Sequence, residues 1–92
     1  MTQDLAETLA LQALAHIIGE PDLCGKFLDL TGIGPSDLPA RVSDGIFLAA
    51  VLEFLLGDEP RLLEFCSAMQ IDPKQPALAH RLLQGGDTPD WS

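Results

Sequence analysis

The chain contains two segments, residues 9–42 and 47–82, that carry the same local signals in the same order. Each has an apolar helical stretch, a break of Gly, acid and Pro, a short amphipathic helix, an Ile-x-Pro break and a last helix. Gly19 and Gly57 are 38 residues apart, and so are Ile33 and Ile71. A repeat of this length constrains architecture before any single residue is considered. It predicts two pseudo-symmetric three-helix units. A second interpretation stays open, because Gly–acid–Pro is common helix punctuation and two helical segments can align by chance.

Six helices are expected from the apolar periodicity and from the residues that start and stop helices. They cover residues 3–18, 21–30, 35–42, 44–56, 59–70 and 72–85, with Ser43 as the cap of the fourth. No segment alternates with the period of a strand. The sequence therefore predicts an all-α fold, a compact bundle of five to six short helices. Residues 1–86 are expected to form a single helical domain and residues 87–92 a flexible C-terminal tail.

The helix expected at residues 44–56 is apolar on almost every side, with Glu53 as its one clearly polar residue. A helix of this kind is buried on most sides. It is either the central helix of the fold or part of a subunit interface, and the central position is the favoured interpretation. Phe47, Val51 and Leu55 are therefore predicted to be among the most buried residues.

Fourteen acidic and five basic residues give the chain a net charge of −9. Eight of the acids fall at expected helix starts, where carboxylates accept first-turn N–H groups. The remaining acids leave an anionic surface, which repels nucleic acid and anionic lipid. No Lys or Arg precedes Lys26, and no apolar stretch is long enough to span a membrane, so a cytoplasmic location is expected. Cys24 and Cys66 are expected to be buried free thiols.

Three strings of the sequence resemble a known family. They are AETLALQAL at residues 6–14, FLDLTGIGP at 27–35 and FLAAVLEFLLGDE at 47–59. They are similar to small bacterial proteins, found mainly in alphaproteobacteria, that are catalogued as a domain of unknown function. The resemblance covers residues 5–84. It implies a small helical protein of the bacterial cytoplasm, and it supplies no catalytic residue and no cofactor.

Two short motifs each suggest a specific function as well as a plain structural role. The turn Gly32–Ile33–Gly34 is similar to the hairpin of helix-hairpin-helix DNA-binding motifs, in which backbone N–H groups hold a phosphate. Asp37 would place a carboxylate against that phosphate, so an ordinary turn is favoured. Ser36 stands at a helix start like the modified serine of acyl carrier proteins, but Pro35 precedes it where those proteins have Asp. A capping role explains Ser36 more simply.

A catalytic or metal site would need His, Cys or carboxylate groups that converge. His16 lies on the polar ridge expected for the first helix, and His80 lies near a helix C-terminus, where a cation is favoured. No Cys-x-x-Cys or His-x-x-x-His pair is present. We therefore expect no enzyme activity, no metal and no cofactor.

An interaction or structural module remains as the leading interpretation, with an unidentified protein or a second copy as its partner. The alternative is a small-molecule-binding protein with a pocket between the two repeat units. Trp91 is the sole Trp, the residue type most enriched at binding hot spots. The candidate partner-binding residues are therefore Trp91, inserted in a groove, with Asp87 and Asp90 at its rim.

Overall fold

The computed structural model describes residues 1–84, which form α1 (Gln3–Ile18), α2 (Pro21–Thr31), η1 (Pro35–Asp37), α3 (Leu38–Arg41), α4 (Gly45–Leu56), α5 (Glu59–Met69) and α6 (Lys74–Leu83). These residues contain no strand, and the helices pack into a compact bundle, so the predicted all-α class is confirmed. Five of the six expected helices begin and end within two residues of their predicted bounds. The expected tail, residues 87–92, and the last two residues of the expected domain lie outside the described residues.

The expected third helix is split into a 3₁₀ turn, η1, and a single α-helical turn, α3. Pro39 is the reason. In an α-helix its N–H would bond to the carbonyl of Pro35, but proline has no N–H. The N–H of Leu38 bonds to the Pro35 carbonyl instead, in the 3₁₀ pattern. The segment is therefore short, and neither η1 nor α3 has a buried residue.

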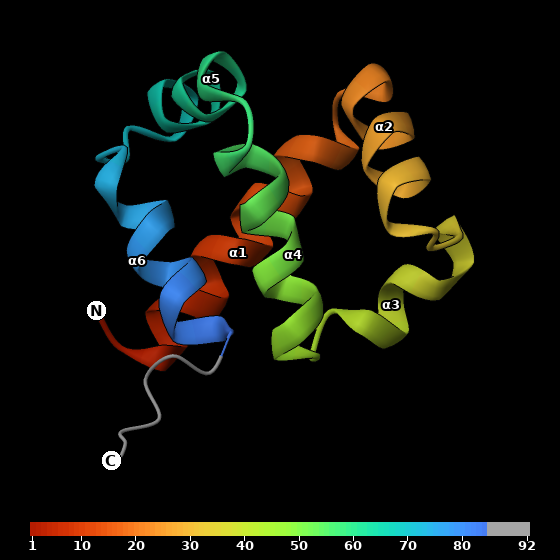
Figure 1. Cartoon of the computed structure of the whole chain (residues 1–92), viewed down its shortest axis with the longest axis horizontal. Helices are drawn as coiled ribbons and strands as arrows, with labels where there is room; N and C mark the ends of the chain where they lie inside the picture. Colours follow the sequence, from red (N-terminus) through yellow and green to blue (C-terminus); the bar gives the residue numbers. More distant parts are fainter. Residues whose placement is uncertain (85–92) are drawn as a thin grey trace.

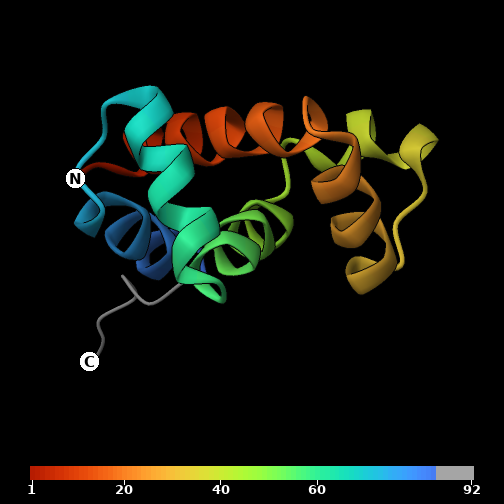
Figure 2. The same cartoon turned by 90° about the horizontal axis from the view of Figure 1, so that it is seen from above.

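Helix α4 lies at the centre of the bundle, as its composition predicted. It packs against α1 and α6 on one side and contacts α5 and α2 on others. Figure 2 shows α6 and α2 on opposite sides of α4, with α1 running across the bundle. Phe47 is 4% exposed, and Val51 and Leu55 are fully buried, so the prediction for these three residues is confirmed.

The core face of α1 contains three small residues. Ala6, Ala10 and Ala13 are fully buried. Their spacing places them on one face of the helix, and their small side chains let α1 lie close to α4 and α6. Leu5 and Ile18 are large and apolar, yet they are exposed.

The two segments predicted to be repeat units, residues 9–42 and 47–82, share the geometry of their first break. The N–H of Gly19 bonds to the Ala15 carbonyl, and the N–H of Gly57 bonds to the Glu53 carbonyl, each at 3.0 Å. The second helix of each unit also ends in a left-handed residue, Gly32 with φ 73° and Gln70 with φ 57°. The third helices differ in length, and superposition of the whole units stays a prediction.

Carboxylates cap several helices as expected, but one cap was assigned to the wrong residue. Asp44, and not Ser43, is the N-cap of α4, because its Oδ1 accepts from the Ile46 N–H at 2.9 Å. Asp58 accepts from the Arg61 N–H, and Asp72 accepts from the Lys74 N–H at 2.9 Å. Part of the acidic composition therefore serves the helix starts.

Candidate functional site

An open groove lies between α4 on one side and α2 and α3 on the other. Its volume is about 630 Å³. Figure 1 shows α6 on one side of α4 and α2 and α3 on the other, and α3 has only four residues. Apolar side chains form most of the groove: Phe27, Leu30, Ile33, Ile46, Phe47, Ala50 and Phe54. Its lining residues come from two stretches of the chain, residues 27–41 and residues 44–61.

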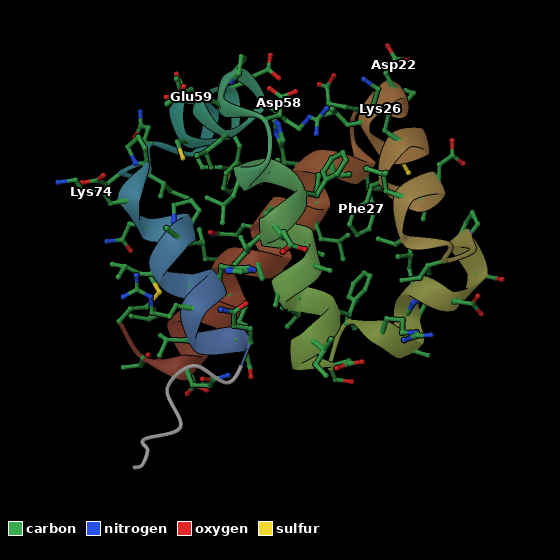
Figure 3. All side chains as sticks on the ribbon, in the orientation of Figure 1. Asp22, Lys26, Phe27, Asp58, Glu59 and Lys74 are labelled. Carbon is green, nitrogen blue, oxygen red and sulfur yellow. The ribbon has the colours of Figure 1, made fainter. Side chains whose placement is uncertain are left out.

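Phe27 forms the support of this groove. Its ring lies edge-on to Phe47, with centroids 5.8 Å apart, and edge-on to Phe54, with centroids 5.4 Å apart. In Figure 3 Phe27 lies between the ribbons of α2 and α4. Edge-to-face aromatic pairs of this kind add about 0.5–1.5 kcal/mol beyond the area they bury. Phe27 therefore links α2 to α4 at the base of the groove.

Two large apolar side chains lie at the groove but are not covered by it. Leu30 near the end of α2 is 76% exposed, and Ile46 in the first turn of α4 is 77% exposed. They are the most exposed of the large hydrophobic residues in the described chain. Single exposed apolar residues are common on protein surfaces, but these two lie at the same apolar hollow.

Arg61 closes one end of the groove and is held firmly. Its guanidinium lies 4.2 Å from the centroid of the Phe54 ring, and its Nη1 donates to the Phe54 carbonyl at 3.3 Å. Its Nη2 lies 3.2 Å from Oδ2 of Asp58. The side chain is only 13% exposed. These contacts occupy much of its donor capacity.

Arg41 lies at the other end and is held loosely. Its Nη1 is 4.0 Å from Oδ2 of Asp44, and its side chain is 51% exposed. An exposed pair at this distance contributes little, so the guanidinium keeps donors for a ligand. Glu53 also lines the groove, and its Oε2 lies 3.9 Å from Nε2 of His80. Two of the five basic residues of an acidic chain thus lie at this groove.

The sequence prediction located none of these groove residues. Its candidate partner-binding residues, Trp91, Asp87 and Asp90, lie outside the described residues. The sequence signal that could have located the groove is the apolar helix at residues 44–56. A helix with no polar face is either covered on all sides or leaves apolar surface exposed. Ile46 is the residue at which that surface is open.

The other residues singled out in the sequence do not form a site together. Gly32 makes a left-handed turn at the end of α2, and Asp37 lies beside Gly34, where a Cβ would be 3.4 Å from its Oδ2. Ser36 lies exposed in η1. His16 was expected on the polar ridge of α1, but its ring packs 5.4 Å from Phe65, and its Nε2 is buried without a hydrogen-bond partner. That expectation was wrong, because α5 covers this end of α1.

Both cysteines are free thiols, Cys24 half-buried and Cys66 buried. Burial raises the pKa of the Cys66 thiol, and the carboxylate of Asp72 raises that pKa further. A thiol of this kind is a poor nucleophile. Within residues 1–84 no group of three or more His, Cys, Asp or Glu side chains is placed to hold a metal ion.

Within the described part of the chain, no helix has the length and apolar character needed to cross a membrane.

One of the comparisons with known proteins gives a match. No curated protein and no solved structure matches the sequence. A family model does match, over residues 3–86, so the predicted resemblance to a domain of unknown function is confirmed. The chain belongs to the family described as "Protein of unknown function (DUF3572)".

Proposed function

We propose that this protein is a non-catalytic interaction module that binds an apolar segment of a partner protein in the groove between α2, α3 and α4. The observation that carries the proposal is the exposure of Leu30 and Ile46, which are both more than three-quarters exposed at one apolar hollow. Burying one such side chain contributes about 1.5–3 kcal/mol. The acidic surface elsewhere disfavours nucleic acid and anionic membranes as partners, and the proposal places the protein in the cytoplasm.

The form of the groove fits a helix or an extended peptide. Recognition of this type uses a few apolar anchors in a groove and charged side chains at its edge. Phe47, Ala50 and Phe54 offer an apolar surface to such anchors, while Arg41 and Glu53 offer one charge of each sign. The groove therefore has the anchors and the orienting charges that one amphipathic segment needs.

A second candidate is binding of a small molecule in the same groove, between the two repeat units. The volume of about 630 Å³ lies within the roughly 300–1,000 Å³ range of ligand sites. An apolar molecule with an anionic group fits best, because its apolar part would contact Phe54 and its anion would lie near Arg41. Leu30 and Ile46 argue for the protein partner, since a small ligand has little need of such exposed residues.

Site-specific cross-linking tests the proposal. A photoreactive amino acid replaces Leu30 in one variant and Leu78 in a matched control, because Leu78 is 43% exposed on α6 and does not line the groove. In cells of the source organism, position 30 should cross-link to one defined protein and position 78 should not. Adding Ile46→Asp to the first variant should abolish that cross-link. Equal cross-linking from both positions, or none from position 30, would contradict the proposal.

Aspartate variants at positions 46 and 78 test the small-molecule candidate. If that candidate is right, native mass spectrometry of the purified protein should show a bound molecule of constant mass. Ile46→Asp should remove that molecule and Leu78→Asp should retain it. A protein without such a mass, together with an Ile46-dependent cross-link, favours the protein partner.

A further inference from the structure

The described chain ends close to the start of α4. A Cβ placed on Gly45, the first residue of α4, would lie 3.5 Å from the Leu83 carbonyl oxygen near the end of α6. The residues on either side of Gly45, Asp44 and Ile46, both line the groove. Residues 85–92 therefore begin within a few residues' length of the groove edge formed by Ile46.

The eight residues that follow are long enough to reach every part of the groove. Trp91 follows Gln84 by seven residues, and an extended chain spans about 3.3–3.6 Å per residue, which gives a reach of about 23–25 Å. Helix α4, which forms one side of the groove, has 12 residues and is about 18 Å long. Gly85 and Gly86 at the start of the segment permit a sharp change of direction.

The chemistry of the segment complements the groove. Its sequence, GGDTPDWS, contains the one Trp of the chain and two carboxylates, those of Asp87 and Asp90. The groove offers an apolar surface around Ile46 and Phe54 and the loosely held guanidinium of Arg41. A Trp with neighbouring carboxylates and an apolar groove with an available Arg form a matched pair.

We propose that residues 85–92 bind in the groove of their own molecule, with the Trp91 indole against Ile46 and Phe54 and a carboxylate of Asp87 or Asp90 beside Arg41. This inference rests on the proposed function, because it makes the C-terminal segment a built-in competitor of the partner. A segment tethered this closely has an effective concentration in the millimolar range. It therefore competes with any partner that does not bind strongly, and partner binding requires its displacement.

Intrinsic fluorescence of the full-length protein tests the proposal, because Trp91 is the sole Trp. The emission maximum should lie at shorter wavelength than that of free tryptophan and should not change on dilution. Ile46→Asp should move the maximum to the position of free tryptophan, and Leu78→Asp should leave it unchanged. Circular dichroism of both variants establishes that they are folded.

Three results would overturn the proposal. A wild-type maximum equal to that of free tryptophan would show that Trp91 is not docked. A blue-shifted maximum that Ile46→Asp does not alter would place Trp91 elsewhere on the molecule. A blue shift that disappears on dilution would identify a second copy as the site.

Failure of this inference is distinguishable from failure of the proposed function. Trp91→Ala in the full chain should increase the yield of the partner cross-link at position 30, because the competitor is weakened. If the cross-link depends on Ile46 but is unchanged by Trp91→Ala, the groove binds a partner and the C-terminal segment does not occupy it. That result would overturn the present inference and leave the proposed function intact.

Discussion

The third segments of the two predicted repeat units differ in length and in burial. In the second unit it is α6, a ten-residue helix that buries Pro76, Ala79 and Leu83. In the first unit it is η1 with α3, seven residues in all, with none of them buried. Helix α6 packs along both α1 and α4, whereas α3 has few contacts outside η1 (Figure 1).

This difference explains where the groove lies. One side of α4 is sealed by a full helix, and the other is faced by a segment too short to seal it. Pro39 lacks the N–H that would bond to the Pro35 carbonyl in an α-helix, so this segment starts as a 3₁₀ turn. The exposed Ile46 lies on the side of α4 that this segment faces.

The largest loss of stability is expected from truncation of Phe47, a core residue of α4. Phe47 is 4% exposed and its ring packs against Phe27. Phe47→Ala should lower the free energy of unfolding by about 3–5 kcal/mol. Thermal unfolding should show a decrease in Tm of more than about 10 °C. Leu78→Ala on the surface of α6 serves as the control. A Phe47→Ala protein that melts within about 2 °C of the parent would contradict the central position of α4.

Truncation of one leucine in each third segment compares the two sides directly. Leu83 of α6 is buried, so Leu83→Ala should lower the free energy of unfolding by about 2–5 kcal/mol. Leu38 of α3 is only half-buried, so Leu38→Ala should lower it by about 1 kcal/mol. Urea unfolding measures both values. Equal losses would mean that α3 contributes to the core as much as α6 does.

Substitutions in the left-handed turns before these two segments should change the free energy of unfolding in opposite directions. Gly32 has φ 73°, and a Cβ there would meet no atom within 4 Å. The effect of Gly32→Ala is therefore one of backbone strain, and it should lower the free energy of unfolding by about 1 kcal/mol. A neutral result in urea unfolding would mean that the turn readily adopts another conformation.

Gln70→Gly should have the smallest effect and the opposite sign. Gln70 has φ 57° in the corresponding turn, where a side chain is strained. Glycine removes the strain but increases the freedom of the unfolded chain. The net result should be a gain of about 0.5 kcal/mol in the free energy of unfolding. A loss of stability in the same urea assay would show that the Gln70 side chain has a role the backbone does not reveal.

Much of the fold was predictable because its signals are local. Glycine breaks such as Gly57, prolines in first turns and carboxylate caps act within a few residues, so helix bounds followed from the sequence. The burial of Phe47 followed from a helix with no polar face. The core alanines of α1 did not follow, because an alanine carries no signal of its own and its burial depends on which helix lies against it.

The groove was not predictable from the sequence, because it depends on contacts between helices. Helical spacing separates Leu28, which packs against the core, from the exposed Leu30, but it does not show that Leu30 and Ile46 lie at one groove. That arrangement depends on how α2 packs against α4 through the ring contacts of Phe27. His16 was misplaced for the same reason, because it lies where Phe65 of α5 contacts α1.

The open groove also determines the colloidal behaviour of the free protein. At neutral pH the charge of −9 keeps molecules apart despite the exposed Leu30 and Ile46. The sequence pI is about 4.2, and near that pH the repulsion disappears while the apolar surface remains. Solubility should therefore reach its minimum near the pI. If the C-terminal segment occupies the groove, Trp91→Ala should precipitate over a wider range of pH than the parent.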